Sequence, residues 1–391
     1  MSRFHSYMNT AEQLIKNYKG DVPLAIFMRS FFSANKKFGS KDRKQISALC
    51  YNYFRIGSAA NGVPPQEKIL MAFFLCENES SDLLEALMPE WNQQINQSLQ
   101  IKFQLLGSKF ILSDLFPFAG RLSETIDAEK FSISFLVQPD LFLRIRPKTR
   151  LGFLKKLEKS KLEYTIKDDD CVVLTNSTNV EEYFTIDKEV IIQDYNSQKV
   201  FDFFKPQNAT YETPLTTIWD CCAASGGKSI LLFDIFNQRI DLTVSDIRPS
   251  IILNLHQRFN KAGLKSYKYF IADIEKTGFE HPVEPSSIIV CDVPCTGSGT
   301  WARTPEQLAF FKEDSIKDFS DRQKKITTNV IPYLKPGGTF VYITCSVFKE
   351  ENEEVVRFIL SKFDLELLRM ELLKGYDKKA DSMFIAVFRK K

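Results

Sequence analysis

The sequence predicts an α/β protein: a parallel sheet with helices on both faces in the carboxy-terminal half, a small α+β module before it, and an all-helical amino-terminal domain. Three patterns along the 391 residues support this organisation. Apolar residues recur at three- and four-residue steps up to about residue 99, alternate in short segments between residues 131 and 204, and then form continuous runs between helical stretches. We place the three parts at residues 1–126, 127–205 and 206–391, which suits a chain of this length.

The amino-terminal part has the apolar spacing of helices that bury one face. The spacing is seen at Ile46, Leu49, Cys50, Tyr53 and Phe54. Glycine and proline interrupt the pattern at residues 19–21, 38–40 and 61–65, where we expect helices to end. These features predict a helical bundle.

The middle part combines short strands with one helix and collects basic side chains. Strand-like segments lie at residues 142–146, 164–166, 171–174 and 190–193, with a helical stretch at 151–162. The basic residues are Arg144, Arg146, Lys148, Arg150, Lys155, Lys156, Lys159 and Lys161, with only Glu158 among them. A solvated helix face would explain any one of these lysines, but the cluster favours a surface that faces nucleic-acid phosphates.

In the carboxy-terminal part, successive apolar strands end in an acid. The four acids are Asp220, Asp246, Asp273 and Asp292, and a fifth strand, residues 339–343, runs into Thr344-Cys345-Ser346. Continuous apolar strands predict a parallel sheet that is covered on both faces. In such sheets ligands bind at the carboxyl ends of the strands, so we expect these acids to line a binding site.

Composition excludes several classes of protein. The 52 basic and 49 acidic residues leave a net charge of only +3, eight cysteines are too dispersed for a disulfide framework, and three histidines give no zinc spacing. The apolar run at residues 69–76 is too short to cross a bilayer, and residues 1–12 lack the apolar core of a signal peptide. We therefore expect a soluble, cytoplasmic monomer with neither a metal site nor a membrane partner.

The loop after the first strand of the sheet is the predicted cofactor site. Residues 220–229 read Asp-Cys-Cys-Ala-Ala-Ser-Gly-Gly-Lys-Ser and precede a helix, and small residues there let a ligand approach the backbone amides. A P-loop would need glycine at Cys222, and a dinucleotide loop would need Gly-x-Gly-x-x-Gly, so neither is complete. S-adenosylmethionine, which has ribose and adenine but no pyrophosphate, fits better.

We assign each part of this ligand to a group of the chain. Asp246 would bind the ribose, Asp273 the adenine amino group, and Lys228 with the loop amides the carboxylate. The predicted cofactor-binding residues are Cys222, Ala223, Ala224, Ser225, Gly226, Gly227, Lys228, Asp246, Asp273 and Asp292.

Two thiols at neighbouring strand ends suggest the chemistry. Carbon 5 of cytosine becomes nucleophilic enough to take a methyl group only after a thiolate adds at carbon 6, and a second group must then remove the carbon 5 proton. A carboxyl group at ring N3 would stabilise the adduct. Cys345, Cys295 and Asp292 could supply these groups. We also expect Ser346 to cap a helix whose positive end lowers the pKa of Cys345.

Three sequence blocks resemble the RsmB/Nop/Sun family of RNA cytosine-5 methyltransferases. They are residues 220–228, residues 292–300 (Asp-Val-Pro-Cys-Thr-Gly-Ser-Gly-Thr) and residues 342–352 (Tyr-Ile-Thr-Cys-Ser-Val-Phe-Lys-Glu-Glu-Asn). The resemblance implies a Rossmann-like class I methyltransferase domain with S-adenosylmethionine as cofactor. It also implies that Cys345 is the nucleophile and Cys295 assists release. DNA cytosine-5 enzymes use the Pro-Cys thiol instead, so the two roles rest on family identity.

The resemblance extends to the rest of the chain. Residues 142–146 and 193–198 are similar to the RNA-binding module of this family, and residues 36–44 to a NusB-like helical domain of members that modify ribosomal RNA. The implied partner is therefore RNA, with ribosomal RNA favoured and the same chemistry on transfer RNA as the alternative. The predicted RNA-binding residues are Arg144, Arg146, Trp301 and Arg303, with ordinary loop packing as the alternative for the last two. The alternative from another functional class is a non-catalytic RNA-binding or assembly factor that has the same fold.

Overall fold

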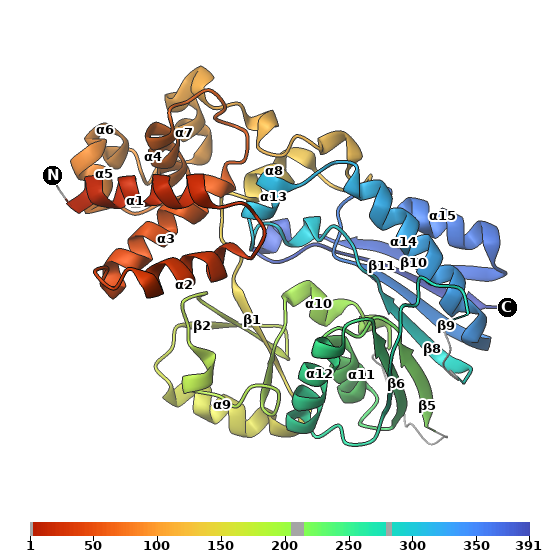
Figure 1. Ribbon diagram of the computed structural model, residues 1–391. Coiled ribbons are helices and arrows are strands. Elements are labelled where there is room, and N and C mark those ends of the chain that lie inside the picture. Colours follow the sequence, from red (N-terminus) through yellow and green to blue (C-terminus); the bar gives the residue numbers. More distant parts are fainter. Residues whose placement is uncertain (1–2, 205–214, 279–283) are drawn as a thin grey trace. The chain divides into compact units, whose positions relative to one another are not determined.

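The computed structural model describes residues 3–204, 215–278 and 284–391, and the chain divides into two compact units. The helical unit contains the residues up to Leu122, together with Asp127–Gln138 and Thr300–Glu313. The sheet unit contains Ser123–Ile126, Pro139–Gly299 and Asp314–Lys391. The α+β module and the large sheet thus share one unit. Each unit also includes residues that the expected boundaries assign to a neighbouring part of the chain (Figure 1).

Helices make up most of the helical unit, as predicted. They are α1 (Arg3–Asn17), α2 (Leu24–Ala34), α3 (Ser40–Arg55), α4 (Pro65–Cys76), α5 (Asp82–Leu87), α6 (Pro89–Gln93), α7 (Leu99–Leu106), α8 (Ala128–Ser134) and α13 (Glu306–Phe310). The predicted breaks separate α1 from α2, α2 from α3, and α3 from α4. The buried Arg55 donates to the carbonyl oxygens of Phe135 and Ala302, both at 2.9 Å, and so ties the two later segments of this unit to α3. The likeness to NusB stays a prediction.

The predicted α+β module forms a four-stranded antiparallel sheet of order β2-β3-β1-β4. Its elements are β1 (Leu141–Ile145), α9 (Arg150–Lys159), β2 (Tyr164–Lys167), β3 (Cys171–Leu174), β4 (Val190–Ile192) and α10 (Tyr195–Lys199). Phe153 of α9 and Leu143 of β1 are fully buried in one apolar cluster with residues of β3 and β4. This cluster is why the alternating segments fold against the amphipathic helix.

The large sheet has seven strands in the order β10-β11-β9-β8-β5-β6-β7. The strands are β5 (Thr216–Asp220), β6 (Ile240–Asp246), β7 (Lys268–Ile271), β8 (Ser286–Asp292), β9 (Leu334–Thr344), β10 (Leu365–Leu373) and β11 (Met383–Lys390). Strands β7, β6, β5, β8 and β9 are parallel, and β11 pairs antiparallel with β9 and β10. Since β5 lies between β6 and β8, the chain reverses direction across the sheet there, which is where such sheets bind ligands.

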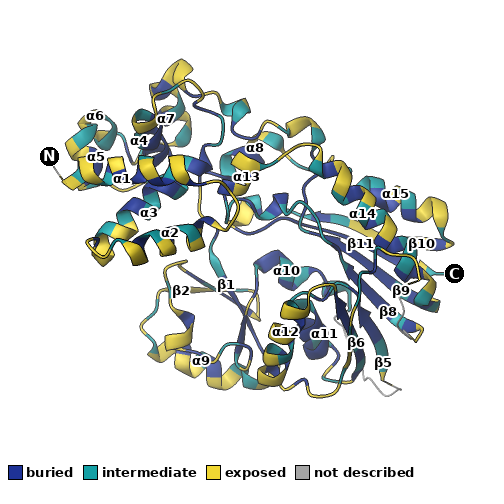
Figure 2. Ribbon diagram, in the orientation of Figure 1, coloured by how far each residue is buried: buried dark blue, intermediate teal, exposed yellow. Residues whose placement is uncertain are grey.

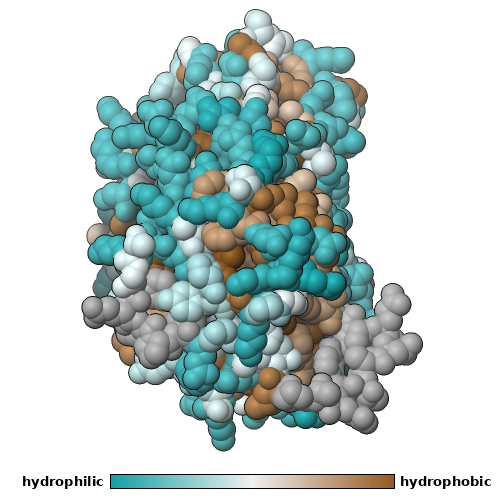
Figure 3. Space-filling model, turned by 90° about the vertical axis from the view of Figure 1, so that its right-hand side faces the viewer, coloured by the Kyte–Doolittle hydropathy of each residue, from teal (hydrophilic) through white to brown (hydrophobic). Residues whose placement is uncertain are grey.

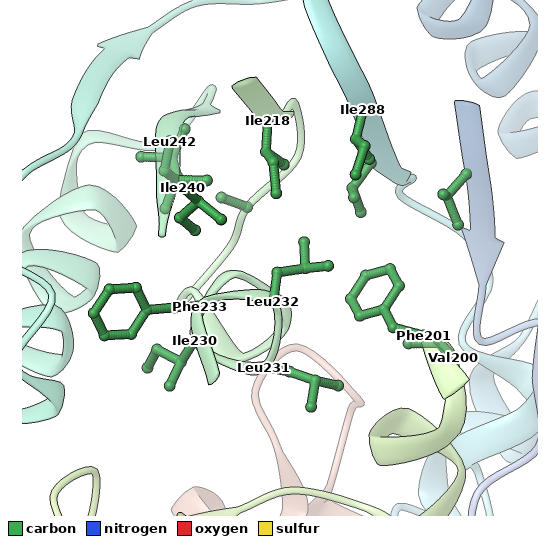
Figure 4. Close-up of a cluster of buried hydrophobic side chains, with 14 of the residues drawn as sticks. Val200, Phe201, Ile218, Ile230, Leu231, Leu232, Phe233, Ile240, Leu242 and Ile288 are labelled. Atoms are coloured by element: carbon green, nitrogen blue, oxygen red, sulfur yellow. The ribbon is translucent and has the colours of Figure 1, made fainter. Parts of the chain in front are cut away.

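Helices cover both faces of this sheet and complete the predicted doubly wound α/β fold. They are α11 (Gly227–Ile235), α12 (Pro249–Ala262), α14 (Ser315–Val330) and α15 (Glu353–Lys362). Figure 4 shows Leu232 of α11 pointing toward the strand residues Ile218 and Ile288, and all three belong to one buried cluster. Residues of α14 and α15 contribute to a separate cluster with other residues of the strands.

Burial follows the layers of the fold. In Figure 2 the central strands of the large sheet are buried, whereas the helices expose one side. The face seen in Figure 3 is mainly hydrophilic with interspersed hydrophobic side chains. Among the described residues, no helix is both long and apolar enough to cross a lipid bilayer.

Candidate active site

The carboxyl ends of β5, β6, β8 and β9 border one cavity of about 450 Å³ in the sheet unit. Its lining includes most of the acids and both thiols singled out from the sequence. The predicted site residues in the lining are the loop residues Cys222 and Ala224, the acids Asp246, Asp273 and Asp292, and the thiols Cys295 and Cys345. The parallel register explains this convergence, because strand ends far apart in the sequence meet at one edge of the sheet.

The cofactor loop is shaped by backbone conformation. Ala224 and Gly226 have positive φ angles of 46° and 79°, and a Cβ atom on Gly226 would lie 2.4 Å from Cε1 of Phe259. Only glycine fits there. The amide of Ala223 donates to the carbonyl oxygen of Ser245 at 2.9 Å, which ties the loop to the end of β6. Ser225 accepts from Arg258 rather than facing the cavity.

Asp220, at the end of β5, lies beneath this loop and is fully buried. Its Oδ2 accepts a hydrogen bond of 2.6 Å from the hydroxyl group of Ser229, the third residue of α11. Burial raises the pKa of the Asp220 carboxyl to about 7, and the charge of Asp292 adds to the effect. Asp220 therefore anchors the start of α11 and does not line the cavity.

Asp246 is held rigidly at the end of β6. It accepts from the amide of Ala224 at 3.1 Å and from the backbone and side chain of Arg248, both at 2.9 Å. Burial alone would raise the pKa of Asp246, but these hydrogen bonds outweigh it and hold the pKa below its usual value. The carboxylate is thus charged and oriented at the cavity wall, as ribose binding requires. Arg248, which the sequence analysis missed, covers it.

Asp273 lines the cavity just beyond the end of β7. Its Oδ1 accepts from the amide of Glu275 at 3.2 Å, and Lys276 forms an ion pair with it at 3.5 Å. Both contacts come from the turn that follows and orient the carboxylate locally.

Lys228 and Asp292 form an ion pair of 2.6 Å between Nζ and Oδ2. Burial lowers the pKa of Lys228, but the charges of Asp292 and Cys345 together outweigh it and raise the pKa overall. The pair therefore joins the start of α11 to the end of β8 and places a cation near the thiol of Cys345. The expected contact of Lys228 with a cofactor carboxylate stays a prediction.

The two thiols are adjacent. The Sγ atoms of Cys295 and Cys345 lie 3.2 Å apart, a hydrogen-bond separation rather than a disulfide. The hydrogen bond to Cys345, together with burial and the nearby Glu351, holds the pKa of the Cys295 thiol well above its usual value. The predicted pairing of two thiols in one pocket is therefore confirmed.

Gly299 keeps the Cys345 strand end close to its neighbours. Its amide donates to the carbonyl oxygen of Cys345 at 2.8 Å, and its carbonyl oxygen accepts from the amide of Ser382 at 2.9 Å. A Cβ atom at this position would lie 2.3 Å from the carbonyl oxygen of Ser382. A glycine is therefore required by close backbone approach.

The predicted helix start beside Cys345 is wrong. Helix α15 begins at Glu353 with Asn352 as its N-cap, several residues beyond Cys345. The Ser346 hydroxyl instead donates to the carboxylate of Glu351 at 2.5 Å and accepts from the amide of Phe348 at 3.1 Å. The acids that follow Ser346 therefore do not all lie in the first turn of α15. One of them, Glu351, points back between the loop that carries Cys295 and the loop that carries Cys345, which we call the two thiol loops.

The predicted RNA contacts of Arg144 and Arg146 are also wrong. They are only 4% and 5% exposed, and both pair with Asp234 of α11, at 2.6 and 2.7 Å. Arg146 also donates to the carbonyl oxygen of Ala262 at 2.6 Å. These guanidinium groups hold the module against the large sheet's helices, because a buried cation needs a partner.

The expected base stacking by Trp301 is wrong for the same reason. Trp301 is 2% exposed, and its ring packs in the helical unit against Phe116 and Phe311, with centroids 6.3 and 4.7 Å away. Arg303 is half-buried, its amide donates to the carbonyl oxygen of Thr300 at 2.9 Å, and its RNA contact stays a prediction.

Within the described ranges, no group of three or more His, Cys, Asp or Glu side chains is arranged to hold a metal ion. Arg248, Arg322 and Glu351 were not predicted as site residues, although Glu351 lies within the sequence block at residues 342–352. Arg322 and Glu351 contact Glu275 and Thr296, which are distant in the sequence, whereas Arg248 pairs with Asp246, two residues before it.

Sequence comparison identifies the domain that carries the site. The family described as 16S rRNA methyltransferase RsmB/F matches residues 205–388. A probable ribosomal RNA small subunit methyltransferase B from Bacillus subtilis is 29% identical over 244 residues, 61% of this chain and 53% of that protein. A ribosomal RNA small subunit methyltransferase B from Enterobacter sp. is 27% identical over 237 residues, 59% of this chain and 54% of that protein. The chain thus spans about half the length of these relatives.

Solved structures share the fold. PH0851 superposes with a TM-score of 0.72 at 18% identity and covers 98% of both chains. A methyltransferase homolog protein from Pyrococcus horikoshii gives a TM-score of 0.58 at 23% identity, over 70% of this chain and 93% of that one. The strand order, the cofactor loop and the paired thiols are consistent with the similarity of residues 205–388 to the RsmB/F methyltransferase family.

Proposed function

We propose that this chain is an S-adenosylmethionine-dependent RNA methyltransferase that methylates carbon 5 of a cytosine in ribosomal RNA. One observation carries the proposal: the cavity whose wall holds Asp246 and Asp273 also holds Cys295 and Cys345. A methyl donor and an attacking thiol must reach the same base, so the chemistry needs one shared cavity. The names of the B. subtilis and Enterobacter relatives favour ribosomal over transfer RNA.

The donor set of the cavity suits S-adenosylmethionine. Asp246 would accept from the ribose hydroxyl groups and Asp273 from the adenine amino group. Lys228, with loop amides other than those of Ala223, Ala224 and Gly226, which donate within the chain, would bind the carboxylate. Carboxylates around the cavity also favour a cationic ligand. When bound, S-adenosylmethionine supplies a methyl group on a sulfonium sulfur.

The side chains around the thiols support covalent activation of the base. The thiolate of Cys345 adds to carbon 6, and the electron pair of the carbon 5–carbon 6 double bond moves to carbon 5, which becomes the nucleophile. The carboxyl group of Asp292 would pair with ring N3. After methylation Cys295, 3.2 Å from Cys345, is placed to take the carbon 5 proton as a thiolate, because the hydrogen bond to Cys345 that raises its pKa is lost once that sulfur is bonded to carbon 6. The bond from carbon 6 to Cys345 then breaks and the double bond re-forms.

A basic groove beside the cavity supports a polyanionic substrate. It has a volume of about 570 Å³, and its lining contains Glu275, which also lines the catalytic cavity. The lysines along it are Lys276, Lys324, Lys325 and Lys362. Glu275 is neutralised by Arg322 at 2.7 Å, so the positive charge of the groove dominates. Such a surface suits the phosphates of a nucleic acid whose base enters the cavity.

A non-catalytic assembly factor on the same fold remains the competing function. It has no need for two thiols at hydrogen-bond distance or for a cation beside one of them, and both features are present. The geometry therefore favours the enzyme.

The experiment that tests the function uses S-adenosylmethionine with a labelled methyl group and total RNA from a host that lacks the gene. We expect label in small-subunit ribosomal RNA as 5-methylcytosine, and none with the Cys345→Ala variant. Label in transfer RNA would reassign the substrate. Absence of transfer at several ionic strengths, from protein shown to be folded, would refute the enzyme.

A further inference from the structure

Glu351 is a buried carboxylate between the two loops that carry the thiols. The residue is 0% exposed. Oε1 accepts from the hydroxyl groups of Thr296 at 2.6 Å and Ser346 at 2.5 Å. Oε2 accepts from the amide of Thr296 and from Nε2 of Gln323, both at 2.9 Å. Four donors therefore satisfy this carboxylate, as its burial requires.

The donors are placed so that the carboxylate connects the reactive groups. Thr296 follows Cys295 directly, and Ser346 follows Cys345 directly. Gln323 of α14 also donates to the carbonyl oxygen of Pro294 at 2.9 Å, so it holds the Pro-Cys loop from its other side. The two thiol loops thus meet at one side chain.

Glu351 is itself fixed by the end of the strand that leads to Cys345. The hydroxyl group of Tyr342, in β9, donates to the carbonyl oxygen of Glu351 at 2.6 Å and to Oε1 of Gln323 at 3.1 Å. The neighbouring Asn352 accepts from Thr344 at 2.6 Å and donates to the carbonyl oxygen of Ser346 at 2.9 Å. The segment after Cys345 therefore folds back on the strand, and Glu351 cannot move independently of it.

We propose that Glu351 is a positioning residue: its carboxylate fastens the loop of Cys295 to the loop of Cys345 and thereby sets the separation of the two thiols. The catalytic consequence rests on the function proposed above. Addition at carbon 6 and removal of the proton at carbon 5 act on adjacent atoms of one ring, so the two sulfur atoms must keep a defined separation. A misplacement of about 1 Å can cost about 100-fold in rate.

Electrostatics support the same assignment. Burial raises the pKa of the Glu351 carboxyl, although the hydrogen bonds from Ser346 and Thr296 oppose this. The carboxylate in turn contributes to the raised pKa of Cys295, after the hydrogen bond to Cys345 and burial. Glu351 thus contributes to the raised pKa of Cys295 as well as holding the two loops together.

The first test measures the thiol separation without RNA or cofactor. The full-length protein is treated with diamide, an azo oxidant that takes up two hydrogen atoms as two thiols become a disulfide, and the Cys295–Cys345 link is quantified by peptide mass spectrometry. We expect rapid linkage in the natural protein and about tenfold slower linkage in Glu351→Ala. Because no methyl transfer is involved, this result is independent of the function.

Glu351→Gln is the conservative variant. Its amide oxygen can still accept from the Thr296 amide and Gln323, while its amino group can donate to the hydroxyl oxygens of Thr296 and Ser346, which accept as well as donate. We expect Glu351→Gln to restore the natural linkage rate. Ser320→Ala is the matched control, because the buried Ser320 donates at 2.7 Å to the carbonyl oxygen of Glu350, the neighbour of Glu351, and not to the Glu351 carboxylate.

The second test separates positioning from stability. We expect Glu351→Ala to lower kcat for methyl transfer by about 100-fold with little change in KM for RNA, whereas Glu351→Gln stays within a few-fold. Should Glu351→Ala fail to fold, Thr296→Val and Ser346→Ala each remove one hydroxyl donor, and the double variant should show the slow linkage. A natural linkage rate in folded Glu351→Ala, or in the folded double variant, would overturn the proposal even if methyl transfer were lost.

Discussion

The ammonium nitrogen of Lys228 lies 2.6 Å from Oδ2 of Asp292, so one ion pair connects the cofactor loop to the strand end that leads to Cys295. The pair is partly buried, and the pKa of its lysine is raised because Asp292 outweighs the effect of burial. Neither residue can therefore be removed without leaving an unpaired charge in the cavity wall, and the ammonium group also lies near the thiol of Cys345.

Removal of Asp292 tests the ion pair. Asp292→Ala should lower the free energy of unfolding by about 1–3 kcal/mol, because the ammonium group of Lys228 loses its partner. Urea unfolding measures this loss. The double variant with Lys228→Met should regain much of it, since no unpaired charge remains. Equal stability of Asp292→Ala and the natural protein would show that the pair contributes nothing.

Substitution of each thiol tests the roles implied by the family. Cys295→Ala should accumulate an RNA adduct that survives denaturing electrophoresis, because Cys345 still adds to carbon 6 but release is impaired. Cys345→Ala should form none. Cys171→Ala, a buried cysteine of the small sheet, serves as the control and should behave like the natural protein. An adduct in Cys345→Ala and none in Cys295→Ala would exchange the two roles.

The basic groove is tested through salt dependence. Lys325→Gln and Lys362→Gln, combined, should weaken RNA binding and reduce the slope of log affinity against log salt concentration by roughly 0.7–0.9 for each phosphate that the protein no longer neutralises. Binding is measured with the Cys345→Ala protein, so catalysis does not contribute. Lys155→Gln with Lys159→Gln on α9 is the comparison. A larger effect from the α9 pair would place the RNA on the small module instead.

Asp220 predicts a specific dependence of stability on pH. The folded state holds the proton of this carboxyl up to pH about 7, whereas the usual pKa is 3.8. The folded state therefore binds more protons between these values, and stability from this group falls as pH rises from about 4 to about 7. The full loss is on the order of 4 kcal/mol, because each pH unit in that interval is worth about 1.4 kcal/mol.

The Asp220→Asn variant isolates this contribution. Its amide oxygen can still accept from Ser229, but it carries no titrating group. Urea unfolding of both proteins between pH 4 and pH 8 should give curves that diverge in favour of Asp220→Asn as pH rises. Parallel curves would mean that the Asp220 carboxyl has an ordinary pKa in the folded protein.

Patterns of local origin were predicted well. The helices of the amino-terminal part and the small α+β module follow from the 3.6-residue and two-residue periods, and the five parallel strands follow from continuous apolar runs. Both kinds of pattern depend only on neighbouring residues. The convergence of Asp246, Asp273, Asp292 and the two thiols also followed, because strand ends of a parallel sheet share one edge.

Side chains whose partners lie far along the chain could not be predicted in this way. Arg144 and Arg146 look like phosphate ligands in a basic segment, yet they pair with Asp234, about 90 residues away. Trp301 follows the Pro-Cys block, yet its ring packs against Phe116. A charged or aromatic residue has the same letter in the sequence whether it faces solvent or fills a core.

The sequence by itself determined the order of the elements, the strand-end acids, the loop of small residues and the two thiols that mark the family. Only the tertiary structure decided which basic residues are structural, which lysines form the groove, and that Glu351 joins the two thiol loops. The physical reason is the range of the interactions. Periodicity and turns are set by adjacent residues, whereas burial, ion pairing and hydrogen bonding of a side chain are set by segments that meet only in the folded chain.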